Sequence, residues 1–164
     1  MSWATATRRG DGALAHADPL LVEYVEQLRR LPRPWGVVGY AVGEVTRSAA
    51  DQRAELAAGR SDLDEWSGGH RIDPAVAIDV WPIDSAGQVI GDPASYSVLR
   101  EAALSAGLQT GAPWGDHGHV QLPDWSARVA AVRDAYPPGE RDGSAGLALA
   151  AGLALGALLL RRSA

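Results

Sequence analysis

The end of the chain differs in chemistry from the rest, and this difference limits what the whole sequence can fold into. Residues 143–160 are 18 positions without a charge, almost all Ala, Leu and Gly, and Arg161 and Arg162 follow them. As a helix this run is roughly 27 Å long, close to the hydrocarbon thickness of a bilayer. Because apolar residues surround it on every side, we predict a transmembrane helix over residues 144–162 rather than an additional core helix.

The stretch before this run is rich in Pro, Gly and charge, which predicts a linker over residues 137–143. Residues 1–136 are enough for one compact domain and too few for two with separate cores.

Hydrophobic residues make up 46% of the chain and charged residues 21%, as in globular proteins. The net charge of −5 disfavours a broad basic surface, so we expect no nucleic-acid partner. The sequence does not set an oligomeric state.

The chain contains no cysteine. This absence excludes disulfide scaffolds, iron–sulfur clusters, cysteine zinc sites and thiol nucleophiles. A metal site in this chain therefore has to be built from carboxylates and histidines. The four histidines are His16, His70, His117 and His119.

Four helices are predicted, each begun by a residue type that caps helix N-termini. Two of the caps precede a proline, which favours the first helical position, and the first three helices end at a proline or a glycine. The predicted caps are Asp18, Ser48, Asp92 and Asp124, and the ends of the first three helices are Pro32, Gly59 and Gly107.

Alternation of apolar and polar residues predicts strands between these helices. Residues 35–46, rich in Val, Tyr and Gly, predict one or two strands with a bend. Residues 75–81 alternate so that Asp79 points away from the core, and residues 119–122 form a short alternating strand. We therefore expect an α+β fold, a small and mostly antiparallel sheet flanked by helices.

Three short motifs lie in order along this predicted domain. They are Glu44-Val-Thr-Arg-Ser-Ala-Ala-Asp-Gln52 with Ala54-Glu-Leu-Ala-Ala-Gly-Arg60, Ser67-Gly-Gly-His70 with Ala77-Ile-Asp79, and Asp116-His-Gly-His119-Val-Gln-Leu122. Together they resemble the zinc-dependent D-alanyl-D-alanine carboxypeptidase family of peptidoglycan peptidases, which includes phage L-alanyl-D-glutamate endolysins. The resemblance covers about residues 18–125 and implies a Hedgehog/D-Ala-D-Ala peptidase-like fold.

The resemblance implies a role for five residues. His70, Asp79 and His119 are implied as ligands of a zinc ion. Asp116 is implied as the general base, and Arg47 as the cation that polarises the scissile carbonyl and stabilises the oxyanion. These roles are chemically consistent, because two imidazoles and one carboxylate leave zinc acidic enough to activate water, and a fixed guanidinium stabilises developing negative charge.

Some assignments stay open at this stage. His70 and Asp79 are nine positions apart, more than in the family motif, so residues 71–74 must bulge. His117, beside Asp116, is an alternative ligand because strand alternation places it on the same side as His119. Asp73 in the bulge is a further alternative carboxylate.

Three residues are candidates for substrate contact. Ser67 and Gln52 either touch substrate or hold the loop, and Trp81 either lines a substrate groove or packs in the core. His16 has no acid at motif spacing and is expected to be an ordinary surface residue.

We therefore expect a zinc metallopeptidase that cleaves the peptidoglycan stem peptide, as an endopeptidase or a carboxypeptidase, and that a C-terminal helix attaches to the membrane. The domain would face the cell wall, or be released at lysis if a phage encodes the chain. One alternative is a catalytically inactive, membrane-anchored wall-binding module of the same fold. Another is a metal-dependent amidohydrolase acting on a small molecule.

Overall fold

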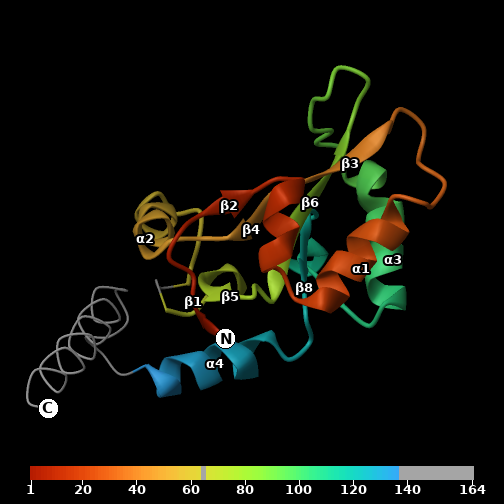
Figure 1. Cartoon of the computed structure of the whole chain (residues 1–164). Helices are drawn as coiled ribbons and strands as arrows, with labels where there is room; N and C mark the ends of the chain where they lie inside the picture. The colour runs from red at the N-terminus through yellow and green to blue at the C-terminus, as the bar shows by residue number, and fades with distance from the viewer. Residues whose placement is uncertain (64–65, 137–164) are drawn as a thin grey trace, which may run out of the picture.

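A four-stranded antiparallel sheet lies at the centre of the computed structural model, which describes residues 1–63 and 66–136 (Figure 1). The strand order is β3-β6-β8-β7, and two shorter pairs, β1-β5 and β2-β4, extend the β-structure. The strands are β1 Ser2–Trp3, β2 Arg8–Arg9, β3 Gly39–Val42, β4 Glu44–Thr46, β5 Ile72–Asp73, β6 Ala77–Ile83, β7 Gln109–Thr110 and β8 His119–Gln121. The α+β prediction is thus confirmed.

In the described part of the chain, four α-helices surround the sheet, as predicted. Helices α1 and α3 pack side by side, while α2 and α4 lie at the other end of the molecule (Figure 1). The helices are α1 Pro19–Leu28, α2 Ala49–Ala57, α3 Ser97–Ser105 and α4 Trp125–Ala135, with 3-10 turns η1 Asp11–His16, η2 Gly69–Arg71, η3 Pro93–Tyr96 and η4 Ala112–Trp114.

The four predicted caps all lie at N-cap positions, and three of them make a capping hydrogen bond. The side chains of Asp18, Ser48 and Asp92 each accept a backbone N–H in the first turn. The segment after Asp92 begins as the 3-10 turn η3 before α3 starts. Asp124 makes no capping bond in the described structure, because its carboxylate pairs with Arg128 at 2.9 Å instead.

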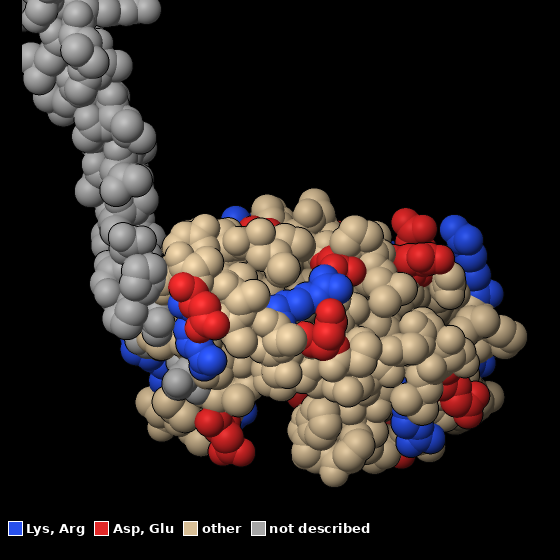
Figure 2. Space-filling view, turned by 90° about the horizontal axis from the view of Figure 1, so that it is seen from below, with Lys and Arg blue, Asp and Glu red and all other residues tan. Residues whose placement is uncertain are grey.

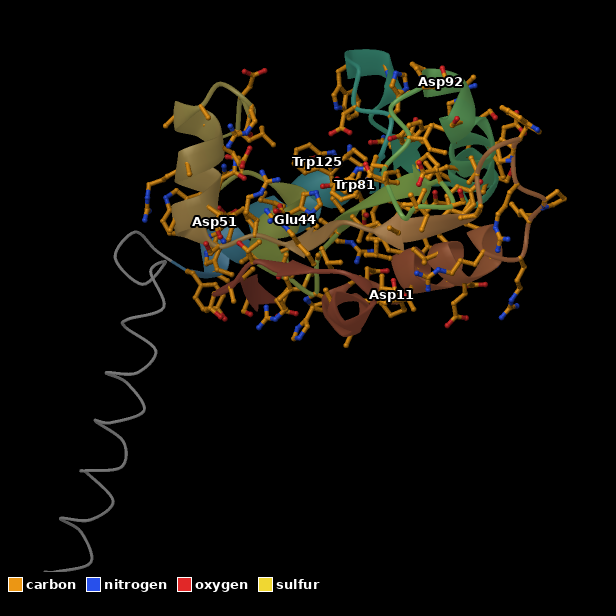
Figure 3. All side chains as sticks on the ribbon, turned by 90° about the horizontal axis from the view of Figure 1, so that it is seen from above. Asp11, Glu44, Asp51, Trp81, Asp92 and Trp125 are labelled. Carbon is orange, nitrogen blue, oxygen red and sulfur yellow. The ribbon has the colours of Figure 1, made fainter. Side chains whose placement is uncertain are left out.

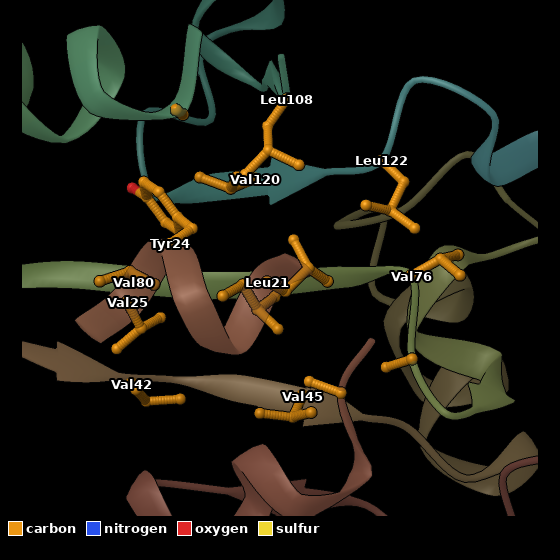
Figure 4. Packing of buried hydrophobic residues seen from close by; sticks show 14 of the residues in the cluster. Leu21, Tyr24, Val25, Val42, Val45, Val76, Val80, Leu108, Val120 and Leu122 are labelled. Atoms are coloured by element: carbon orange, nitrogen blue, oxygen red, sulfur yellow. The ribbon is translucent and has the colours of Figure 1, made fainter. Parts of the chain in front are cut away.

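The core lies between β6, β8 and the helices α1 and α3 (Figure 4). The predicted alternation is confirmed, although β6 begins at Ala77, two residues later than expected. Val76 and Val80 are fully buried and pack with Leu21 and Tyr24 of α1. This packing fixes one face of β6 in the core and directs Asp79 to the opposite face.

The N-terminal arm is part of the sheet structure, which the sequence pattern did not predict. β1 pairs with β5, and β2 pairs with β4. The fully buried Arg71 lies 5.7 Å from the rings of both Trp3 and Trp66 and donates to the carbonyl oxygens of Ala4 and Arg47. The arm is therefore held against the residue that follows His70.

The predicted linker over residues 137–143 and the predicted membrane helix over residues 144–162 lie outside the described residues. Within the part of the chain that the structure describes, no helix is both long and apolar enough to cross a membrane.

Candidate metal centre

Two of the predicted ligands lie side by side on neighbouring strands of the central sheet. Asp79 on β6 and His119 on β8 are direct register partners in an antiparallel pair. Side chains of directly opposed residues leave the sheet on the same face, with Cβ atoms about 4.5–5.5 Å apart. The register of the sheet therefore brings the two residues together although 40 positions separate them in the chain.

The third predicted ligand, His70, comes from η2, which packs against β4 and β6. The backbone N–H of Arg47 donates to the carbonyl oxygen of His70 at 2.8 Å. Gly69 must be a glycine here, because a Cβ would lie 2.9 Å from the Cβ of Ala77. This close seating buries the imidazole of His70 and directs it toward Asp79.

The donor atoms of the three residues form a nearly regular triangle. His70 Nε2 lies 3.4 Å from His119 Nδ1 and 3.5 Å from Asp79 Oδ1. The third side, from His119 Nδ1 to Asp79 Oδ1, is 3.1 Å. Tetrahedral zinc ligands at 2.0–2.1 Å from the ion are roughly 3.3–3.4 Å apart, so the spacing fits zinc. Among the described residues these three form the group that could hold a metal ion.

Each imidazole turns one ring nitrogen toward the centre of the triangle and bonds the other to an acceptor. His70 Nδ1 lies 3.0 Å from the carbonyl oxygen of Val45, which only accepts, so Nδ1 carries the proton. His119 Nε2 lies 3.0 Å from Oε1 of Gln121, which also only accepts, so Nε2 carries the proton and donates it. Sequence analysis missed this contact of Gln121 with the ring; the i, i+2 spacing in the predicted strand was the available signal.

The charges of the three groups depend on one another. Burial raises the pKa of a carboxyl group, but the imidazoles of His70 and His119 hold the pKa of Asp79 well below its usual range. Burial also lowers the pKa of an imidazole, whereas the hydrogen bond and charge of Asp79 raise the pKa of His119. Without a metal ion, the site therefore favours a carboxylate beside a protonated imidazole. A metal cation can take the place of that proton.

Arg47, the predicted oxyanion-stabilising cation, is held in a fixed orientation next to η2. Its Nε donates to the carboxylate of Glu44, and its Nη1 donates to Gln52 Oε1 at 2.9 Å. Glu44 is buried and also accepts from Arg9 at 3.1 Å. Sequence analysis missed Glu44 as the partner of Arg47, although it lies three positions earlier in the same motif.

Gln52 lies behind Arg47 rather than on an open surface. It is 2% exposed, and its amide nitrogen donates to Ser61 Oγ and to the carbonyl oxygen of Leu63. This environment favours the loop-holding role of Gln52 over direct substrate contact. Ser67 lies half-buried just before η2. Its neighbour Gly68 lies beside Gln52, because a Cβ there would be 3.7 Å from Gln52 Oε1.

Asp116, the predicted base, lies exposed beside His119. Its backbone N–H donates to the carbonyl oxygen of Gly111 at 3.1 Å. A Cβ on Gly111 would lie 2.9 Å from the Cβ of His119 and 3.0 Å from that of Asp116. Gly111 therefore lets the two residues approach each other, and the charge of Asp116 contributes to the raised pKa of His119.

Trp81 lies two positions after Asp79 on the same face of β6 and is half-buried. Its indole packs against two glycines: a Cβ on Gly43 or on Gly118 would lie 2.6 Å from the ring. In Figure 3, Trp81 and Glu44 lie between α2 on one side and the segment around η4 on the other. The structure thus places Trp81 close to the metal centre while it also packs against backbone.

His117 is not brought to the metal centre. Among the described residues it does not belong to the group that could hold a metal ion, and its ring lies 5.8 Å from that of Tyr96. His117 precedes the first residue of β8, His119, so the alternation of that strand does not fix its orientation.

Asp73 and His16 bind each other instead of a metal. His16 Nδ1 lies 3.0 Å from Asp73 Oδ2, and Arg8 lies 3.7 Å from the same oxygen. His16 is partly exposed, as expected of a surface residue, but sequence analysis missed its pairing with Asp73. The long spacing between His70 and Asp79 is accommodated by β5, which contains Asp73 and pairs with β1.

A notch opens along one edge of the molecular surface (Figure 2). Figure 3, seen from the opposite side, shows α2 and the segment around η4 projecting on either side of this edge. The fold and the geometry together define a small α+β domain with a His, Asp, His centre.

Comparisons with known proteins agree with that definition. No family profile matches the chain, and no curated protein matches it by sequence. Among solved structures, the chain is similar to the Serratia marcescens L-Ala D-Glu endopeptidase ChiX, with a TM-score of 0.56 and 28% sequence identity. The match covers 74% of this chain and 91% of that one.

Proposed function

We propose that this chain is a zinc-dependent peptidase that hydrolyses a peptide bond in the stem peptide of peptidoglycan. The convergence of His70 Nε2, Asp79 Oδ1 and His119 Nδ1 in a triangle of zinc-like spacing carries the proposal. The similarity to an L-Ala D-Glu endopeptidase supplies the substrate class and makes the L-Ala–D-Glu bond the first candidate.

The three residues fit zinc in chemistry as well as in spacing. Two neutral imidazoles and one carboxylate form a common catalytic ligand set, and three protein ligands leave a fourth position for water or substrate. When bound, zinc supplies a Lewis acid that polarises a carbonyl and makes water a nucleophile near neutral pH.

Asp116 acts as the proton carrier in this proposal. Its carboxylate takes a proton from the attacking water as the new C–O bond forms, and it returns that proton to the amine nitrogen as the C–N bond breaks. Solvent exposure and proximity to His119 support this role, because the group has to lie beside the reacting water and exchange protons freely.

Arg47 stabilises the carbonyl oxygen as negative charge develops on it. The bonds from its Nε to Glu44 and from its Nη1 to Gln52 orient the guanidinium before substrate arrives. Donors that are already oriented lower the activation free energy most, because no reorganisation is needed during the reaction.

The proposal is tested with the purified full-length chain. Zinc content is measured by elemental mass spectrometry, and released muropeptides are identified by mass spectrometry after incubation with cell-wall sacculi. We expect about one zinc per chain and new amino termini in the wild type. Asp116→Asn should keep the zinc and lose hydrolysis, whereas Asp124→Asn, the same change at a carboxylate that pairs with Arg128, should behave as wild type.

Two results would contradict the proposal. Full hydrolysis by the Asp116→Asn variant would remove Asp116 from the mechanism. A wild type that binds zinc and sediments with sacculi but releases no amino termini would identify a wall-binding module instead of an enzyme.

We also propose that residues 144–162 attach the domain to a membrane, with the domain facing the cell wall. Support comes from the uncharged run and the two arginines that follow it. The full-length chain should float with membranes in a density gradient, and a charge placed in the run by Leu155→Arg should release it. External protease should digest the domain in spheroplasts; protection would reverse the proposed orientation.

A further inference from the structure

Both ring nitrogens of His119 are engaged, and the two partners differ in kind. Nδ1 faces Asp79 at 3.1 Å, at the metal centre. Nε2 faces Oε1 of Gln121 at 3.0 Å, on the side away from the centre. An amide oxygen accepts and does not donate, so this contact requires the proton on Nε2 and leaves the Nδ1 lone pair for a metal ion.

The amide of Gln121 has two orientations, and only one of them supports metal binding. If the amide flipped, its NH₂ group would face Nε2 and favour a lone pair there, which moves the ring proton to Nδ1. In the structure, the amide nitrogen of Gln121 donates to Oε1 of Gln109 at 3.1 Å, so the amide oxygen is the atom that faces Nε2. Gln109 and Gln121 are register partners on β7 and β8, so the sheet holds this pair in place.

Because Gln121 is buried, its contact with His119 controls which ring nitrogen carries the proton. Gln121 is 7% exposed, so water has little access to replace its amide oxygen as the acceptor. Gln109 is exposed, and the chain of hydrogen bonds therefore runs from the metal centre to the surface. Partners of this kind fix the ring orientation and the basicity of a histidine ligand.

We propose that Gln121, oriented by Gln109, is a positioning residue that sets the tautomer and the ring orientation of His119 for zinc. This inference rests on the proposed function only in so far as the centre binds zinc. It does not depend on which bond the protein cleaves, or on whether it cleaves one.

The test measures zinc affinity of the metal-free full-length protein by competition with a chromogenic chelator. Gln121→Leu should weaken zinc binding by about 10–100-fold, because the acceptor is lost. Gln121→Glu keeps an acceptor at the same place and should bind zinc at least as tightly as wild type. Gln109→Leu, which frees the Gln121 amide to flip, should lose a smaller factor. Gln27→Leu, the same change on the exposed face of α1, should have no effect.

A second measurement separates this role from general support of the fold. In zinc-loaded, ¹⁵N-labelled protein, the Nε2 proton of His119 should be protected from solvent exchange in the wild type. This protection should persist in Gln121→Glu and be lost in Gln121→Leu at an unchanged circular dichroism spectrum.

The outcomes are distinct. Zinc affinity of Gln121→Leu or, if that variant does not fold, of Gln109→Leu within twofold of wild type would overturn the positioning role. The same holds if the affinity of Gln121→Glu falls as far as that of Gln121→Leu. A wild type that binds zinc but hydrolyses nothing would overturn the proposed function and leave this inference standing. A wild type that binds no zinc would overturn both.

Discussion

The two sides of the metal centre each hold one imidazole, and they hold it by different means. On the η2 side, the ring proton of His70 is bonded to the main-chain oxygen of Val45. On the β8 side, the ring proton of His119 is bonded to the side chain of Gln121. A main-chain acceptor is present whatever the sequence, whereas a side-chain acceptor can be gained or lost by one substitution. The β8 side is therefore the one on which metal affinity can be tuned.

The two sides also differ in how they present charge. On the η2 side, Arg47 is held between Glu44 and Gln52, both buried. On the β8 side, Asp116 is exposed. The difference follows from the proposed roles, since a group that stabilises charge benefits from a fixed position and a group that carries protons needs contact with water.

The largest effect is expected at Asp79, which contacts the imidazoles of both sides. Asp79→Ala removes one of three ligands and leaves two imidazoles without their acidic partner, so zinc should be lost and hydrolysis should fall by at least about 10³-fold. Zinc content and release of amino termini from sacculi measure this. Asp84→Ala, in the exposed turn after β6, is the matched control. Retained zinc would show that the triangle is not the metal site.

The next largest effect tests the η2 side. Arg47→Ala should lower kcat by about 10²–10³-fold and leave zinc affinity unchanged, because the loss occurs in the transition state. Arg47→Lys should recover little, since an ammonium cannot bond Glu44 and Gln52 in the same fixed geometry. Steady-state hydrolysis of a stem-peptide substrate measures both, with Arg30→Ala, at an exposed position just after α1, as control. A change in KM alone would assign Arg47 to binding only.

A smaller effect tests the close packing on the β8 side. Gly111→Ala places a methyl group against Asp116 and His119, and overpacking of this kind costs about 1–3 kcal/mol of unfolding free energy. We expect a lower Tm together with a lower kcat, because the base and a ligand are displaced at once. Gly91→Ala, where a Cβ meets nothing within 4 Å, is the control. A lower Tm with full activity would show that Asp116 need not stay where it is.

The smallest expected effect is a pH dependence of the stability of the metal-free protein, which arises from the contact between Asp79 and His119. The pKa of His119 is raised on folding, so its contribution to stability is present below about pH 6.5 and is lost as the pH rises through the folded value. The pKa of Asp79 is lowered, so its contribution is present above about pH 3.9 and is lost as the pH falls. The pair therefore stabilises the metal-free protein most between these values.

Thermal melting of chelator-treated protein measures this dependence. The Tm difference between wild type and Asp79→Asn should shrink by a few degrees from pH 6 to pH 8, because the Tm of the wild type falls. Added zinc should restore the Tm of the wild type at pH 8. A difference that grows over this range without metal would contradict the assigned direction.

Much of the scaffold could be predicted because its signals are local. An Asp or Ser cap bonds an N–H within three residues, and the alternation around Asp79 follows from the two-residue period of a strand. The failures have equally physical causes. Asp124 lies at the N-cap position of α4, but its carboxylate pairs with Arg128 instead of making a capping bond. His117 precedes the first residue of β8, so the strand period could not place it.

The sequence alone determined which residue types are available and where the local elements begin: an α+β domain without cysteine, with His70, Asp79 and His119 in motifs that indicate a metal. Only the tertiary structure decided which nitrogen of each histidine faces the centre, through Val45 and Gln121, and how Glu44 orients Arg47. It also decided that Arg71 holds the N-terminal arm by donating to the carbonyl oxygen of Ala4. The reason is that these contacts join strands, turns and buried charges through register and packing, and no periodicity along the chain records such pairings.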